Sequence, residues 1–173
     1  PSDTKQRLEF IKDFRATARR IAELADGVPY YIHSVVRGLK DAGNTASPEE
    51  TEGIVRAALV ADQDPWNLRH YEARLKGYYG IERRPVVLAV LDELSAEEGT
   101  LGLDALLGRL KVKPYPEGCV IASEILSGNR DVLLELIQLL RSDHYLCQHE
   151  NGTYGFRFPL IKRWWRLHRG LSC

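Results

Sequence analysis

The residue types best suited to chemistry lie close together near the end of the chain, in the segment His144-x-x-Cys147-x-His149. Imidazole and thiolate groups bind zinc, and a cysteine paired with a histidine can act as a nucleophile. On a β-strand, however, Cys147 and His149 share one face while His144 takes the other. A fourth zinc ligand would have to come from Cys119 or His168, and spacing alone places no histidine within reach of the Cys147 thiol. We therefore predict no metal site and no catalytic residue.

A second chemical feature is a group of cations after Asn151, a stretch that contains no acidic residue. These side chains are candidates for nucleic-acid phosphates: Arg157, Lys162, Arg163, Arg166 and Arg169. The group is local, because residues 81–173 hold 12 basic and 12 acidic residues. The alternative interpretation is that these arginines face water while apolar neighbours such as Trp164 anchor the helix that carries them. Both interpretations stay open.

The segment Asp131–Ser142 is the candidate helix for reading DNA bases, and its composition argues against that role. It offers Glu135, Gln138 and Arg141 among positions that are largely leucine and isoleucine. A carboxylate repels the DNA backbone, and one arginine supplies little attraction. We expect this helix to serve packing.

The composition is that of an ordinary globular protein, with 173 residues, 44% hydrophobic and 28% charged. Its 24 lysines and arginines balance 24 acidic residues, which argues against a chain whose whole surface binds nucleic acid or anionic membrane. The longest apolar run, Val86–Leu91, is far short of the roughly 20 residues that span a bilayer. Three cysteines and no secretory signal favour a cytoplasmic location. The start at Pro1 and the lack of methionine suggest a piece of a longer protein.

Apolar spacing of three and four residues predicts helices throughout the first half. One helix covers Thr4–Ala25 and ends at Asp26-Gly27, and the next begins at Pro29. Ser47-Pro48-Glu49-Glu50 is a capping-box start, and Asp64-Pro65 repeats the device of a capping residue followed by proline. The prediction is an all-helical domain over residues 1–80.

The second domain, residues 81–173, is expected to add a β-hairpin to helices. Its helices are predicted over 85–97, 101–111, 120–126, 131–142 and 159–169. The hairpin joins His144–His149 to Thr153–Phe158 through Glu150-Asn151-Gly152, a strong turn signal. Helices followed by a hairpin are typical of a winged helix, so the expected fold is mainly α: a helical bundle, then a winged-helix domain with a hairpin wing and a C-terminal helix.

The chain resembles the C-terminal part of bacterial and archaeal P-loop ATPases of the AAA+ and STAND types. Ala25-Asp-Gly-Val-Pro-Tyr-Tyr-Ile32 resembles the Gly-x-Pro motif of their helical lid. Further similarity lies in Asp64–Tyr71, in Asp143–Leu146 and in Tyr154–Arg166, which contains Phe-Arg-Phe-Pro-Leu-Ile-Lys-Arg-Trp-Trp. The resemblance covers nearly the whole chain.

The resemblance implies that Gly27, Val28 and Pro29 approach the adenine of ATP in the parent protein. A glycine that ends one helix and a proline that begins the next also account for this triplet without a ligand. The chain contains no Gly-x-x-x-x-Gly-Lys-Ser/Thr and no apolar strand ending in Asp-Glu, so we expect no hydrolysis by this chain and assign ATP and magnesium to the parent only.

Two functions follow. The first is a non-catalytic region that couples the nucleotide state of a parent ATPase to a protein or DNA partner through the winged helix. Its other partner would be the P-loop core of the same parent chain. The parent could also form an oligomer. The second is a stand-alone winged-helix DNA-binding regulator. A helical interaction module without any link to nucleotide is a third.

Overall fold

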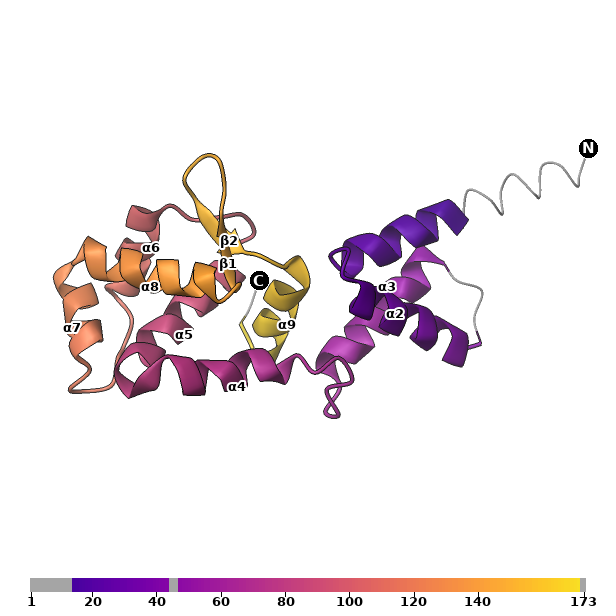
Figure 1. Ribbon diagram of the computed structural model, residues 1–173, viewed down its shortest axis with the longest axis horizontal. Helices are drawn as coiled ribbons and strands as arrows, with labels where there is room; N and C mark the ends of the chain where they lie inside the picture. Colours follow the sequence, from indigo (N-terminus) through magenta and orange to yellow (C-terminus); the bar gives the residue numbers. More distant parts are fainter. Residues whose placement is uncertain (1–13, 44–46, 172–173) are drawn as a thin grey trace, which may run out of the picture. The chain divides into compact units, whose positions relative to one another are not determined.

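The computed structural model describes residues 14–43 and 47–171. These residues are mainly helical and include a small two-stranded antiparallel sheet, which confirms the mainly helical class predicted from the sequence (Figure 1). They form two compact units that divide between Asn67 and Leu68. Each unit has its own buried apolar residues and is described separately.

The first unit contains a helix over 14–24, α2 (Pro29–Asp41) and α3 (Pro48–Val60). The first part of the helix predicted over Thr4–Ala25, residues 4–13, lies outside the described residues. Close packing of α2 on α3 depends on Gly38, because a Cβ at this position would lie 2.7 Å from the Ile54 side chain. The buried apolar side chains are Ile21, Leu24, Ala25, Tyr31, Val35, Leu39, Val55, Leu59 and Trp66.

The start of α3 is the capping box that the sequence predicted. The Ser47 hydroxyl accepts a hydrogen bond from the Glu50 amide at 3.1 Å, and the Glu50 carboxylate accepts one from the Ser47 amide at 3.1 Å. Pro48 occupies the first turn, where a backbone N–H has no partner in the helix. Two otherwise unpaired amides are thereby satisfied.

The helix start predicted at Asp64-Pro65 is wrong, because α4 covers Arg69–Tyr78. Asp64 and Asn67 both adopt left-handed backbone conformations, with φ of 47° and 55°, so the chain turns here instead of entering a helix.

α4 packs against α5 in the second unit, whereas the sequence analysis had grouped it with residues 1–80. Its tie to that unit is visible at Tyr71, whose carbonyl accepts a hydrogen bond of 2.6 Å from the Tyr145 hydroxyl.

The second unit is built around α5 (Gly80–Ala96), which packs against α4, α6 (Leu103–Leu110), α7 (Val120–Ser127) and α9 (Pro159–His168). α8 (Arg130–Ser142) packs on α6 and α7. α5 begins earlier than the predicted Pro85, which lies inside the helix. Proline removes one hydrogen bond near the start of the helix, at the carbonyl of the exposed Ile81, where water can replace it.

The hairpin consists of β1 (Leu146–Gln148) and β2 (Tyr154–Phe156), and it confirms the turn predicted at Asn151-Gly152. Gly152 has φ of +79°, which glycine adopts at low cost. On the side of β2 away from β1, Leu101 and Tyr154 exchange backbone hydrogen bonds of 3.0 and 2.8 Å. β2 is therefore paired on both sides, and β1 is the outer strand.

Candidate functional site

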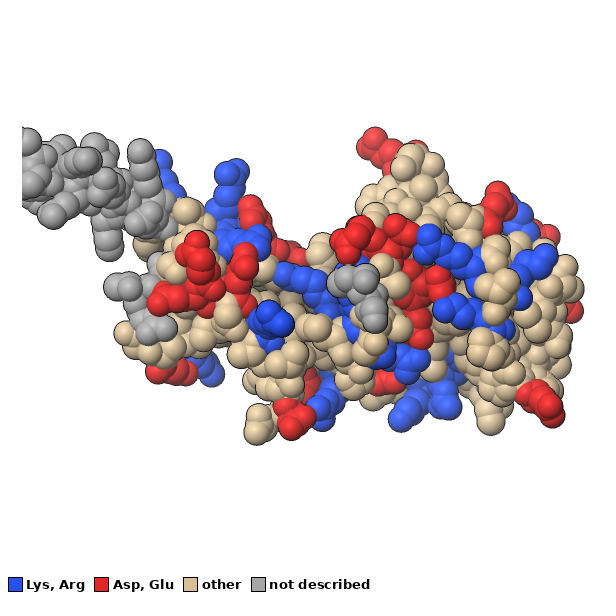
Figure 2. Space-filling view, turned by 180° about the vertical axis from the view of Figure 1, so that it is seen from behind, with Lys and Arg blue, Asp and Glu red and all other residues tan. Residues whose placement is uncertain are grey.

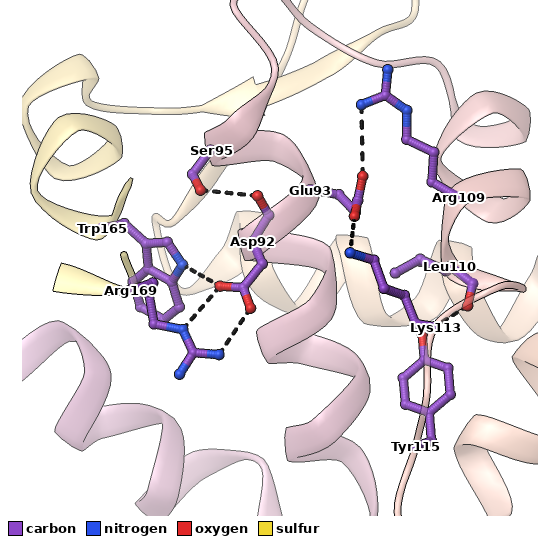
Figure 3. Close-up of polar contacts among 9 residues, drawn as sticks. All are labelled: Asp92, Glu93, Ser95, Arg109, Leu110, Lys113, Tyr115, Trp165 and Arg169. Carbon is purple, nitrogen blue, oxygen red and sulfur yellow. Dashed lines mark hydrogen bonds and ion pairs between the residues drawn. The ribbon is translucent and has the colours of Figure 1, made fainter. Parts of the chain in front are cut away.

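Arg169, one of the five predicted phosphate-binding cations, is bound to a carboxylate of α5. Its guanidinium donates hydrogen bonds of 3.1 and 2.8 Å to the two oxygens of Asp92 (Figure 3). The indole N–H of the fully buried Trp165 donates to the same carboxylate at 2.8 Å. The hydrogen bond to Asp92 raises the pKa of Arg169. This side chain holds α9 on α5.

Arg166 and Lys162 bind the backbone at the end of α5 and just after it. The Arg166 Nε donates to the Ser95 carbonyl at 2.7 Å, and its Nη1 donates to the Glu98 carboxylate at 2.8 Å. The Lys162 ammonium donates to the carbonyls of Glu98 and Gly99 at 3.3 and 3.4 Å. Carbonyls at a helix end lack partners within the helix and attract cations. Arg166 therefore caps a carbonyl of the last turn of α5, and Lys162 binds the carbonyls of the residues that follow the helix.

Burial, together with the neighbouring Arg166, lowers the pKa of Lys162. Arg163 is half-buried and lines a cavity of 310 Å³ with Lys162, Arg166 and His149. The structure thus places Lys162, Arg163 and Arg166 on α9 and Arg169 at its C-cap, and three of these four stabilise the packing of the helix. It does not gather all five on one open surface.

Arg157, the fifth predicted cation, lies instead in a groove of 630 Å³ between α8 and β1, which we call the α8–β1 groove. α8 contributes Gln138, Arg141 and Ser142, and the sheet contributes Leu146–Gln148 together with Arg157. Arg141 and Arg157 are both exposed, and the lining contains no acidic residue. Within residues 14–43 and 47–171, neither arginine forms an ion pair.

The pairing of Arg141 with Arg157 escaped the sequence analysis, which noted Arg141 as a single cation on a packing helix. The hairpin register brings the two together, because the Arg157 amide donates a hydrogen bond of 2.9 Å to the Tyr145 carbonyl just after α8. The predicted hairpin was the one sequence signal that could have indicated this proximity. Antiparallel pairing returns the chain to the end of the preceding helix, which carries Arg141.

Two tyrosines fix the connection between α8 and β1. The Tyr79 hydroxyl donates a hydrogen bond of 2.6 Å to the Asp143 carboxylate, and Tyr145 bonds the Tyr71 carbonyl. Burial is the main reason that the pKa of Tyr145 rises to about 12, and burial with the Asp143 hydrogen bond also raises the pKa of Tyr79. The groove therefore has a firmly held end where α8 meets the hairpin.

The cysteine–histidine segment includes β1, with Cys147 in the strand and His149 directly after it. The Cys147 Sγ is 3.7 Å from the His149 Nε2, and His144 precedes the strand with φ of 64°. Among the described residues, no group of three or more histidine, cysteine, aspartate or glutamate side chains is arranged to hold a metal ion.

The predicted adenine-contacting triplet forms the turn between the helix over 14–24 and α2. Gly27 is left-handed with φ of +68°, Val28 is extended, and Pro29 opens α2. Pro29 lines a cavity of 450 Å³ whose other walls are Tyr30, His33, Ser34, Arg37 and Pro65. The structure brings Pro29 to this cavity, but Gly27 and Val28 are not part of its lining.

Comparison of the chain with models of known protein families, with curated proteins and with solved structures finds no match. No helix in the described part of the chain has both the length and the apolar character needed to cross a bilayer.

Proposed function

We propose that this chain is the non-catalytic C-terminal region of a P-loop ATPase of the AAA+ or STAND type, and that it couples nucleotide state to a partner molecule through a winged helix in its second unit. The observation that carries the proposal is the α8–β1 groove. It contains two arginines without ion-pair partners, whereas Arg166 and Arg169 nearby in sequence bind acidic residues of the same chain.

The order of elements in the second unit supports the winged-helix assignment. α5 is followed by Leu101, which pairs with β2, then by α6, α7 and α8, and finally by the hairpin. A winged helix places one short strand after its first helix and two after its last, with the last helix exposed for recognition. In this assignment α8 is the recognition helix and the hairpin is the wing.

The cavity at Pro29 supports a role for the first unit in sensing nucleotide. Tyr30 is 54% exposed and offers an aromatic surface, while His33 and Arg37 offer polar or cationic groups. Aromatic stacking and arginine contacts suit a purine nucleotide whose phosphates are held by a P-loop elsewhere in the parent protein. ATP and magnesium belong to that parent core in this proposal.

The test is a matched pair of proline substitutions in the parent ATPase. Pro29→Ala removes a ring from the cavity wall and is expected to weaken ATP binding several-fold. Pro48→Ala is the control, because Pro48 also begins a helix but does not line the cavity. ATP affinity would be measured by calorimetry, and equal affinities for both variants would contradict the lid role.

A stand-alone winged-helix DNA-binding protein is the second candidate, and the side chains on the exposed side of α8 favour it. Gln138 and Arg141 are types that read adenine and guanine in the major groove. The exposed acids Asp131, Glu135 and Glu150 lie on α8 and at the hairpin turn, where they would repel DNA. Titration of the chain against a labelled duplex at low salt tests this second candidate, because the absence of binding there would contradict it.

A further inference from the structure

We infer that the α8–β1 groove binds an extended acidic peptide, which pairs with the outer edge of β1 as an additional strand. This inference rests on the proposed function and names the class of partner that the winged helix engages. It is carried by three observations: the open edge of β1, the groove that β1 and α8 line together, and the charge of that lining.

The outer edge of β1 offers unpaired backbone groups. The hydrogen bonds from Arg157 N–H to the Tyr145 carbonyl and from His149 N–H to the Thr153 carbonyl bracket the ladder. Bonded pairs alternate in an antiparallel ladder, so Cys147 and Gly155 form the bonded pair between them. The N–H and C=O groups of Leu146 and Gln148 therefore point outward, and no other strand lies there in the described part of the chain.

All three residues of β1 line the groove. Successive strand residues project to opposite faces, so Leu146 and Cys147 lie on different faces of the hairpin. Both line the groove, as does Gln148. The groove therefore lies against β1 itself, with α8 as the opposite wall and Arg157 beside the start of the strand. Peptides commonly bind sheet proteins by adding a strand at such an edge.

The charge of the lining specifies an acidic occupant. Arg141 stands on the α8 wall and Arg157 beside the start of β1, with no acidic residue between them. A second copy of this chain pairing through its own β1 would bring four arginines together, which is unfavourable. Duplex DNA would extend beyond the groove to Glu135 on α8 and Glu150 at the hairpin turn. A narrow acidic peptide meets the arginines and avoids these carboxylates.

The surface charge of the second unit agrees with a local rather than a broad attraction. Lysine, arginine and acidic side chains are interspersed on the face seen in Figure 2, without a continuous basic surface. Residues 81–173 also hold 12 basic and 12 acidic residues, so net long-range attraction to a polyanion is weak and affinity depends on short-range contacts in the groove. Binding is expected to weaken as salt concentration rises, because the arginines are exposed to solvent.

The experiment uses the 173-residue chain and a pool of peptides about eight residues long. Glutamate or aspartate occupies every second position of each peptide, with valine, isoleucine, threonine or tyrosine between them. Bound peptides are recovered with the chain by size exclusion and identified by mass spectrometry. We expect enrichment of a subset, and no enrichment of any peptide would overturn the inference.

Three variants test the geometry on the enriched peptide. Arg141→Gln with Arg157→Gln is expected to weaken binding about tenfold or more, since each charge-assisted contact is lost. Arg83→Gln, an exposed arginine of α5 outside the groove, is the matched control and is expected to have no effect. Gln148→Pro removes one outward N–H while leaving the bonded pair at Cys147, and it is expected to weaken binding with the fold retained by circular dichroism.

A backbone-modified peptide provides the decisive measurement. Methylation of alternate backbone nitrogens removes the donors that a strand needs and leaves the side chains intact. We expect this peptide not to bind, and equal binding would overturn strand addition. If a labelled duplex binds through Arg141 and Arg157 while no peptide does, the peptide inference fails and the proposed partner-binding role survives. If the parent shows no effect of Pro29→Ala, the proposed function fails independently.

Discussion

Individual cations in this chain have different roles according to the partners that the fold provides. Asp92 receives the indole of Trp165 and both arms of Arg169, while Arg166 binds carbonyls at the end of α5. A charged group that is partly withdrawn from water needs such partners, because its desolvation would otherwise be costly. Arg141 and Arg157 remain exposed and have no such requirement.

Asp92 should contribute measurably to stability. Asp92→Ala removes three hydrogen bonds and leaves the Trp165 N–H without its partner, so we expect a loss of about 2 kcal/mol in the free energy of unfolding. Asp104→Ala is the matched control, since Asp104 forms an exposed ion pair with Arg130 and should cost less than about 1 kcal/mol. Urea denaturation measures both, and equal losses would contradict the role assigned to Asp92.

Tyr145 should make stability depend on alkaline pH. Its pKa is about 12 in the folded chain and ordinarily 10.0, so above pH 10 the unfolded chain loses a proton that the folded chain retains. The contribution is complete below pH 10 and is lost as the pH rises to 12. Tyr145→Phe should make this decline less steep and cost about 1 kcal/mol at neutral pH through the lost bond to Tyr71. Urea denaturation across this range is the measurement, and an unchanged decline would contradict it.

The sequence grouped five cations as one candidate site, but the structure separates Arg157 from the other four and gives Lys162, Arg166 and Arg169 partners within the chain. The partners of Arg166 and Arg169 lie on α5 or just after it, about 70 residues earlier in the chain, and two of them are backbone carbonyls with no sequence signature. The groove was equally hidden, because Gln138 and Arg157 meet only after the hairpin has paired. Long-range packing decides both outcomes.

At the scale of elements, local signals predicted starts and turns well where the chemistry is local. The capping box at Ser47, the first-turn proline at Pro29 and the turn at Gly152 all formed as expected. The start proposed at Asp64-Pro65 failed because a left-handed Asn67 follows and delays the helix to Arg69. Backbone conformation at a single residue can override a helix-start signal.

Two serines in the first unit test the value of capping. Ser47→Ala removes the acceptor for the Glu50 amide and is expected to lower the free energy of unfolding by about 1 kcal/mol. Ser34→Ala lies within α2, where the hydroxyl bonds the Tyr30 carbonyl of the same helix, and should be neutral or slightly stabilising. Thermal denaturation followed by circular dichroism compares them, and a larger loss for Ser34→Ala would exclude the capping account.

At the scale of the molecule, the structure divides into two compact units between Asn67 and Leu68, whereas the sequence analysis placed its domain boundary after residue 80. Periodicity shows that α4 is a helix and does not show which core it joins. The hydrogen bond from Tyr145 and the packing on α5 place α4 with the second unit. The whole chain has a net charge of +0, which accords with binding through a small groove rather than a broad charged surface.

The chain by itself should not turn over ATP. None of its 173 residues forms the phosphate-binding Gly-x-x-x-x-Gly-Lys-Ser/Thr motif, so nothing of that kind can neutralise charge on a transferred phosphoryl group. We expect no release of phosphate from ATP and magnesium above the level of a protein-free blank. ATPase activity that co-purifies with the chain through successive purification steps would refute this expectation and with it the non-catalytic role.

The two ways in which α9 is fastened to α5 imply different patterns of divergence. Arg166 binds main-chain oxygens, which every amino acid possesses, so mutations at Ser95 can accumulate without breaking that contact. Arg169 depends on the side chain of Asp92, so a substitution at either position leaves the other residue without this ion-pair partner. Covariation between orthologues should therefore couple 92 with 169, while 166 stays constant beside a variable neighbour.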